Sequence, residues 1–171
     1  MKKYIIKQTK TKGNGLYANK NFKKDELILI VDLSRLKSFT AKQMQKDPKL
    51  QSDHCDYVGN QRFVISHHPY SYMNHSCDPN VYVKHLSMKK MKYYAMRNIR
   101  KGEELTYDYG ANALEGFDKI GWKSFKCACG SKKCRKIVFS NFFKLPKRLQ
   151  KNYFQYLPPG IKRRYKKNGK I

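Results

Sequence analysis

The chain has 171 residues and a formal net charge of +26, with 38 Lys or Arg against 12 Asp or Glu. That length is enough for one domain with a real core, and a hydrophobic share of 40% with 13 Tyr and 9 Phe argues against a disordered chain. No run of eighteen apolar residues occurs, and the N-terminus turns polar after residue 6. The sequence therefore predicts neither a membrane span nor a secretory signal, and we expect an intracellular protein.

Short strands separated by turns are predicted over the first two-thirds of the chain. Segments rich in β-branched or aromatic residues predict strands at residues 3–8, 27–32, 62–65, 80–85, 91–97 and 104–107. One short helix is predicted over residues 40–46, with Thr40 as its N-cap. Turns are predicted at residues 13–15, 78–80 and 101–102. This pattern predicts a mainly β protein with short helices.

The pattern becomes helical after residue 140. Pro146 suits the first position of a helix, and apolar side chains then recur at helical spacing at Leu149, Tyr153, Phe154 and Leu157. We expect this helix to end before Pro158, and a second short helix and the basic tail KRRYKKNGK (162–170) to follow. No repeat or long linker divides the chain, so we do not expect independent domains.

Positive charge is concentrated near the C-terminus. Residues 119–171 contain seventeen Lys or Arg and no Asp or Glu. A surface of this kind attracts polyanions and acidic proteins, and salt screens the attraction. The charge predicts a nucleic-acid or nucleosome partner; the alternative is the solvated face of a lysine-rich protein. It gives no information about catalysis.

The cysteines predict a metal site. Five are present: Cys55, Cys77, Cys127, Cys129 and Cys134. An odd number in an intracellular chain argues against disulfides. The segment CACGSKKC (127–134) offers three thiolates, one short of the closed tetrahedral set of a structural zinc site. Cys77, in the tight polar turn SYMNHSCDPN (71–80), is the better candidate for the fourth ligand. Cys55 or the adjacent His54 is the alternative, as are three reduced cysteines without metal.

Three motifs in order resemble a SET-domain protein lysine methyltransferase with a cysteine-rich post-SET segment. They are NHSCDPN (74–80), RKGEELTYDYG (100–110) and CACGSKKC (127–134), and TKGNGLYA (11–18) is similar to the Gly-x-Gly opening of that domain. The resemblance implies a SET domain over residues 1–118, a post-SET zinc segment over 119–140 and a basic helical extension over 141–171. It also implies small curved β-sheets, with a pseudoknot that brings residues 107–109 to the Asn-His stretch.

The resemblance implies two bound groups, S-adenosyl-L-methionine and Zn²⁺. Contacts with S-adenosylmethionine are implied for Lys12, Gly13, Asn14, Gly15, Asn74, His75 and Phe125. The zinc ligands it implies are Cys77, Cys127, Cys129 and Cys134. Tyr57 is expected to line the channel for the target lysine, which enters from the face opposite the cofactor. The alternatives are an ordinary surface turn at residues 13–15 and a core position for Phe125 and the nearby Trp122.

Two tyrosines carry the expected chemistry. Methyl transfer needs a neutral amine, and a free lysine, with a pKa of about 10.4, arrives protonated. Aromatic walls and phenol oxygens desolvate and orient the amine. Tyr109 matches the family's catalytic tyrosine, which we interpret as a positioning and electrostatic group. Tyr107, two residues earlier, would face the same side of a strand. The resemblance implies that this position acts as a product switch, and a tyrosine there predicts mono- or dimethylation. The alternative is a Tyr107 that only packs.

Two classes of function remain. The first is an S-adenosylmethionine-dependent protein lysine N-methyltransferase acting on a histone or another protein, nuclear or chromatin-associated in a eukaryotic cell and otherwise cytoplasmic. The second is a non-catalytic basic chromatin or nucleic-acid-binding protein that keeps the SET fold, and a plainer version is a small zinc-stapled basic protein. The intact Asn74, His75 and Tyr109 favour the enzyme, because a binding protein needs none of them.

Overall fold

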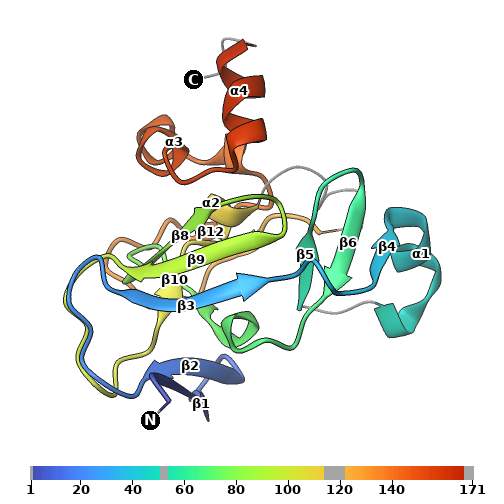
Figure 1. Ribbon diagram of the computed structural model, residues 1–171. Coiled ribbons are helices and arrows are strands. Elements are labelled where there is room, and N and C mark those ends of the chain that lie inside the picture. Colours follow the sequence, from blue (N-terminus) through green and yellow to red (C-terminus); the bar gives the residue numbers. More distant parts are fainter. Residues whose placement is uncertain (1, 51–53, 114–121, 168–171) are drawn as a thin grey trace.

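The computed structural model describes residues 2–50, 54–113 and 122–167 (Figure 1). Short strands dominate the first two-thirds of the chain, and helices α3 and α4 lie at the opposite end of the molecule from the hairpin of β1 and β2. Among the residues that the structure describes, no helix has the length and apolarity that crossing a bilayer requires. The predicted class, mainly β with short helices, is confirmed.

Small sheets form the body of the protein. An N-terminal hairpin joins β1 (Tyr4–Gln8) and β2 (Asn14–Ala18). One antiparallel sheet has the order β3 (Leu27–Asp32), β9 (Lys90–Ala95), β8 (Val81–His85). A second has the order β4 (Ser38–Thr40), β6 (Arg62–Ile65), β5 (Cys55–Tyr57). Two further pairs are only two residues long. Strand β7 (Asn74–His75) pairs in parallel with β10 (Thr106–Tyr107), and β11 (Phe125–Lys126) pairs antiparallel with β12 (Ile137–Val138).

The helices are short. The α-helices are α1 (Ala41–Lys46), α2 (Tyr109–Asn112), α3 (Lys147–Phe154) and α4 (Pro159–Lys167). Single 3-10 turns are η1 (Pro48–Leu50), η2 (Pro69–Tyr72) and η4 (Phe142–Lys144). At α1 the Thr40 hydroxyl accepts from the Gln43 N–H while the Gln43 side chain accepts from the Thr40 N–H, so the predicted N-cap is confirmed as a full capping box.

Two apolar clusters hold these elements together. In β9, Met91, Tyr93 and Ala95 alternate with more exposed residues and face the main core. The second cluster lies at the C-terminal end, where buried side chains recur at every fourth position from the end of α3 through α4, at Tyr153, Leu157, Ile161 and Tyr165. That spacing gives one apolar stripe, and it packs against Tyr57 and Met88 of the β-rich part.

The parallel pair of β7 and β10 positions the site. Thr106 and Tyr107 stand opposite Asn74 and His75, so two motifs thirty residues apart in sequence become neighbours. The buried Asn80 side chain supports this pairing, because it donates to the Glu104 carbonyl at 2.9 Å and accepts from the Thr106 N–H at 2.9 Å. Contacts between residues distant in sequence thus place both motifs on one short strand pair.

Several element boundaries differ from the sequence predictions. Asn14 and Gly15 begin β2 instead of lying in the predicted turn, because they pair with β1 across the hairpin. Pro146 is the N-cap of α3 and not its first residue. The second helix starts at Pro159, because proline is compatible with the first turn of a helix. From the sequence, this residue is expected only in the segment that ends the preceding helix. Residues 162–167 of the expected tail therefore belong to α4.

Candidate active site and metal cluster

Two cavities meet at Tyr109. The larger, called here the large cleft, has a volume of about 540 Å³. The smaller, called here the tyrosine cavity, has a volume of about 60 Å³. Residues that line both are His54, Ser71, Tyr109 and Trp122. A group bound in the large cleft can therefore reach a group bound in the tyrosine cavity at the side chain of Tyr109.

The large cleft gathers most of the residues expected to contact the cofactor. Lys12, Asn14, Asn74 and Phe125 line it, although they come from three distant stretches of the chain. Phe125 is 44% exposed and meets the Trp122 ring edge-on, with centroids 5.7 Å apart. The alternative of Phe125 as a core residue is therefore wrong.

Glu104, which sequence reasoning missed, organises the polar wall of the large cleft. Its carboxylate accepts from Lys12 Nζ at 2.9 Å and from Asn74 Nδ2 at 2.8 Å. Asn74 Nδ2 also lies 3.2 Å from the Asn14 carbonyl. The acidic residue in RKGEELTYDYG was visible in the sequence, but only the fold shows that it faces Lys12.

The two glycines expected at the cofactor site, Gly13 and Gly15, occupy positions that suit glycine for different reasons. A Cβ on Gly15 would lie 2.8 Å from Thr9 Cγ2 and 3.1 Å from Asn74 Nδ2, so only glycine allows β2 to approach this closely. Gly13 has a φ of +68°, a left-handed conformation that favours glycine. Neither glycine is among the described lining residues of the large cleft.

Tyr109 is fixed by hydrogen bonds at both ends. Its hydroxyl donates to the Met73 carbonyl at 3.2 Å, and its backbone N–H donates to His75 Nδ1 at 3.2 Å. The ring centroids of Tyr107 and Tyr109 lie 5.0 Å apart, and both side chains line the tyrosine cavity. They do not share a strand as expected: β10 ends at Tyr107, and α2 begins at Tyr109 after the Asp108 N-cap.

The Tyr107 hydroxyl is protonated in the folded protein. Burial raises the pKa of Tyr107 well above its usual value, and the neighbouring Tyr109 and Asp56 act in the same direction. The Tyr93 ring packs perpendicular to it, with centroids 6.1 Å apart. Tyr107 can therefore donate a hydrogen bond into the tyrosine cavity but does not act as a base near neutral pH.

Strand β5 contributes a different residue from the one expected. Tyr57, expected to line the lysine channel, instead lines a separate groove beside α4. The preceding Asp56 lines the tyrosine cavity, together with Cys55. Burial raises the pKa of Asp56 to about 6, although the hydroxyl of Tyr70, which donates a hydrogen bond to it, acts against that rise. The signal available in the sequence was a carboxylate at the centre of a short strand whose two other residues, Cys55 and Tyr57, are uncharged.

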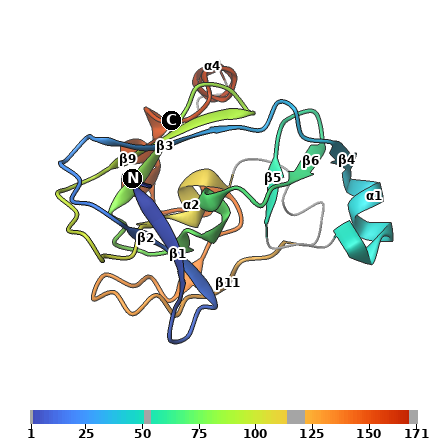
Figure 2. The same ribbon diagram turned by 60° about the horizontal axis from the view of Figure 1, so that its bottom comes forward.

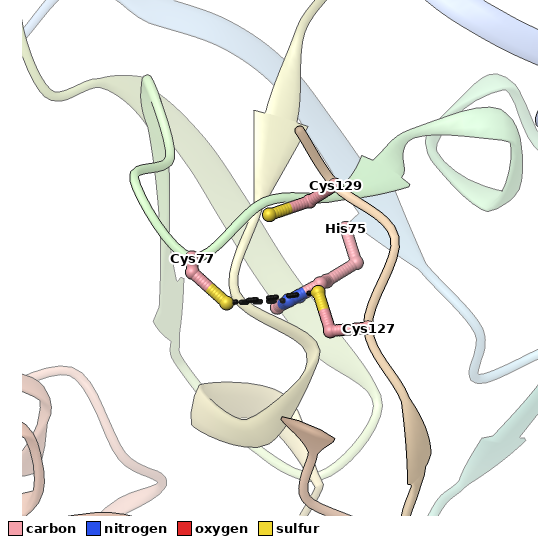
Figure 3. A group of neighbouring side chains, drawn as sticks. All are labelled: His75, Cys77, Cys127 and Cys129. Carbon is pink, nitrogen blue, oxygen red and sulfur yellow. Dashed lines mark hydrogen bonds between the residues drawn. The ribbon is translucent and has the colours of Figure 1, made fainter. Parts of the chain in front are cut away.

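Three thiols and one imidazole form a cluster (Figure 3), and the imidazole ring of His75 lies 5.3 Å from the Tyr109 ring, measured between centroids. Ligand atoms of His75, Cys77, Cys127 and Cys129 all lie within 4.8 Å of one another. The Cys77 sulfur is 3.3 Å from His75 Nε2 and 3.7 Å from the Cys127 sulfur. His75, expected at the cofactor, thus directs its ring into this cluster and is absent from the described wall of the large cleft.

Cys134 borders the cluster. Its sulfur lies 3.9 Å from the Cys127 carbonyl oxygen and 3.4 Å from the Lys136 nitrogen, which donates to it. Cys55, the alternative ligand, lines the tyrosine cavity instead. Three of the four expected ligands are therefore brought together with His75, and the fourth lies next to them.

The donor chemistry of this cluster suits a thiophilic metal ion. Burial would raise the pKa of Cys129, but hydrogen bonds from the Cys77 and Ser131 backbone and from the neighbouring thiols lower it to about 7. Burial lowers the pKa of His75 to about 4, so its imidazole is neutral. Thiolates and neutral imidazole are the ligands that Zn²⁺ prefers in proteins. The described residues therefore fit a metal-binding group.

Comparison with known proteins identifies the family, since the sequence profile of the SET domain matches residues 13–110. The chain belongs to the SET-domain family. It is 32% identical over 149 residues to "Histone-lysine N-methyltransferase set-2" of Caenorhabditis elegans, covering 78% of this chain and 9% of that protein. It is 30% identical over 145 residues to "Histone-lysine N-methyltransferase, H3 lysine-36 specific" of Candida albicans, covering 80% and 16%. The chain thus spans less than a fifth of either relative.

A solved structure shows the same fold. The methyltransferase domain of human histone-lysine N-methyltransferase SETMAR superposes with a TM-score of 0.59 at 20% sequence identity, covering 81% of this chain and 58% of that one. The expected SET fold is therefore confirmed.

Two residues beyond the matched SET domain, Arg135 and Tyr153, contact Asp108 inside it. The Asp108 carboxylate is fully buried and accepts from Arg135 Nη2 at 2.8 Å and from the Tyr153 hydroxyl at 3.3 Å. It also caps α2 by accepting from the Gly110 N–H at 3.1 Å. The cysteine-rich segment and α3 thus both contact the residue that directly precedes Tyr109, a link that sequence spacing did not predict.

Proposed function

We propose that this protein is an S-adenosylmethionine-dependent protein lysine N-methyltransferase. The observation that carries the proposal is the meeting of the large cleft and the tyrosine cavity at Tyr109, within a SET domain. S-Adenosylmethionine, when bound, supplies a methyl group on a positively charged sulfur. A cleft for the donor that opens onto a narrow aromatic cavity for the acceptor is the arrangement that an in-line transfer needs.

The large cleft would hold the cofactor. Lys12 and Asn74 offer polar groups for its amino-acid part, and Asn14 offers backbone groups beside them. Phe125 presents an exposed aromatic face that suits the adenine ring. Gly13 and Gly15 allow the β2 backbone to approach, which is the role we propose for them in cofactor binding.

The tyrosine cavity would receive the target lysine. Its aromatic walls exclude water, and desolvation lowers the pKa of an amine and favours the neutral form that reacts. The Tyr109 hydroxyl, held by the Met73 carbonyl, keeps its oxygen lone pairs available to orient the amine and the methyl group. Tyr107 offers a protonated phenol on the same wall, which supports its proposed role in limiting the number of methyl groups.

We extend the proposal to a zinc ion in the cysteine cluster. Cys77, Cys127 and Cys129 would bind it with Cys134 as the fourth ligand, and His75 is the competing ligand because a ring nitrogen of His75 lies within 4.8 Å of these three sulfurs. The ion would tie the post-SET segment to the Asn-His stretch. It would thereby stabilise the part of the large cleft wall formed by Trp122 and Phe125.

The proposed substrate is a lysine of a histone or of another protein. Both relatives described above are named histone-lysine methyltransferases, which supports a histone and a nuclear or chromatin context. The net charge of +26 would repel a free basic tail but attract a tail presented on nucleosomal DNA. We propose residues 1–118, 119–140 and 141–171 as SET, post-SET and basic extension segments of one folded unit.

The test combines cofactor binding with methyl transfer. Calorimetry should detect S-adenosylmethionine binding, and mass spectrometry should detect methylated lysine on nucleosomes more than on free histones. Tyr109→Phe should keep cofactor affinity and reduce methyl transfer roughly a hundredfold, since it removes only the oxygen at the reacting centre. Nucleosome binding without cofactor binding or transfer would instead support the non-catalytic alternative.

A further inference from the structure

Three carboxylates surround the proposed active site, and two of them have a cation beside them. Glu104 pairs with Lys12 Nζ at 2.9 Å, and Asp108 pairs with Arg135 Nη2 at 2.8 Å. Asp56 differs, because no ion pair to it is found among the described residues. The described wall of the tyrosine cavity contains no Lys or Arg at all, in a protein that has 38 of them.

Asp56 is held in place by local structure. It pairs with Val64 across β5 and β6, which directs its side chain to the tyrosine cavity, and the Tyr70 hydroxyl donates a hydrogen bond to it. Burial disfavours its charged form, as the raised pKa shows. A half-buried carboxylate that has lost part of its water and has no cation beside it is unfavourable, so its position in the wall of the cavity suits a cation that comes from outside the chain.

We propose that Asp56 binds the side-chain ammonium of the acceptor lysine in the tyrosine cavity. This inference rests on the proposed function and names the group that selects a cationic amine. A lysine ammonium is a compact charge with three N–H donors. Asp56 and the phenol oxygens of Tyr107 and Tyr109 supply acceptors on the walls of the same cavity. Lysine would be bound here in preference to an uncharged side chain of the same length.

The proposal makes a specific kinetic statement. An ammonium has no free lone pair, so contact with Asp56 stabilises the protonated ground state and not the methyl transfer itself. Asp56→Asn should therefore raise KM for the histone or nucleosome substrate roughly tenfold while kcat stays unchanged or rises. A catalytic base would behave in the opposite way, because its loss would lower kcat.

A binding experiment tests the contact without any methyl transfer. The probe is n-butylammonium, which reproduces the lysine side chain, and 1-butanol is the uncharged analogue of the same length. In NMR titrations the wild type should bind n-butylammonium more tightly than 1-butanol. Asp56→Asn should weaken n-butylammonium binding roughly tenfold and remove this preference, with cofactor affinity unchanged.

Tyr70→Phe is the matched control. It removes the hydrogen bond to Asp56 but keeps the carboxyl group. Because that hydrogen bond lowers the pKa of Asp56, the control is titrated at pH ~9, where the carboxyl is charged and n-butylammonium is still protonated, and there it should retain the preference for n-butylammonium. Equal loss of preference in both variants would mean that Asp56 only supports the fold around Tyr70, and would overturn the proposal. A wild type without any preference would overturn it too, with no variant needed. If the wild type binds n-butylammonium through Asp56 but neither binds S-adenosylmethionine nor methylates, the proposed function fails and the cation site stands.

Discussion

At the scale of single residues, Tyr107 and Tyr109 place two phenol groups side by side in one small cavity. Tyr107→Phe removes a hydroxyl that can hold the amine or a water, and it frees space for a larger methylated nitrogen. We expect the product to shift from mono- and dimethyllysine toward trimethyllysine with little change in the rate of the first methylation. Mass spectrometry of a time course on nucleosomes measures this shift.

Tyr93→Phe provides a control for the Tyr107 experiment. Tyr93 packs against Tyr107 and also carries a buried hydroxyl, but it is not among the described lining residues of the tyrosine cavity. Its removal should leave the distribution of methyl states unchanged. A wild type that already trimethylates efficiently would contradict the product-switch role of Tyr107.

Asp56 should also affect the free energy of unfolding and its dependence on pH. Its folded pKa of about 6 lies above the ordinary value of 3.8, so the folded state binds the proton more tightly than the unfolded state. The stability from this group is present at low pH and is lost as pH rises through about 6. Asp56→Asn, which still accepts from Tyr70, should therefore raise the free energy of unfolding by about 2 kcal/mol near neutral pH.

The pH series decides whether charge is the cause of that gain. The stabilisation by Asp56→Asn should shrink as pH falls from about 6 toward 4 in urea unfolding curves. Cys55, Tyr70, Tyr93 and Tyr107 interact with the charge of Asp56, and burial raises the pKa of each, so these four do not titrate in this acidic range. His54 also lines the tyrosine cavity, and its contribution is common to the wild type and Asp56→Asn, so it cancels in their difference. A gain that is independent of pH would point to packing instead of charge.

At the scale of elements, the cysteine-rich segment connects the metal cluster with the large cleft. Cys77→Ser should lose most of the bound zinc, because Cys77 contacts both His75 and Cys127. The same variant should bind S-adenosylmethionine more weakly, since Trp122 and Phe125 of this segment wall the cleft. Elemental analysis and calorimetry on the same preparation measure both effects. Cys55→Ser is the control, and zinc lost from it but retained by Cys77→Ser would contradict the ligand assignment.

Sequence predicted best those elements whose signals are local. The α1 helix follows from its capping box, and β3 and β6 have the predicted bounds. The pair of β7 and β10 is only two residues long, so it has no periodicity to detect, and its motifs could be placed together only by family resemblance. The element was thus predictable where its stabilising contacts lie close in sequence.

The assignment of β5 shows why site residues are harder to predict than elements. We expected Tyr57 of this strand to line the lysine channel. In the structure Asp56 lines the tyrosine cavity, and Tyr57 lines a separate groove. A shift of one residue reverses the face of a strand, and the register is set by pairing with β6 and not by the strand itself. Glu104 and Asp108 were missed for a related reason: their partners, Lys12 and Arg135, lie far away in sequence.

At the scale of the whole molecule, the buried face of α4 determines which of its charges are available. Ile161 and Tyr165 pack into the C-terminal cluster, while Arg163 and Lys166 are exposed. Helix α4 projects at one end of the molecule, far from α1, as both views show (Figures 1 and 2). The basic helix is therefore anchored by its apolar stripe and exposes Arg163 and Lys166 to solvent.

The last prediction is that this helix contacts nucleic acid. Replacing Arg163 and Lys166 by Gln should weaken binding to duplex DNA and reduce the slope of log K against log salt by about two, one for each phosphate that the helix no longer neutralises. Lys42 and Lys46, exposed on α1, are the matched control, because their replacement by Gln removes the same charge at a distant place. Fluorescence anisotropy over a salt series measures both pairs. Equal weakening by both pairs would mean that DNA senses only the net charge of +26, and binding that ignores salt would contradict phosphate binding altogether.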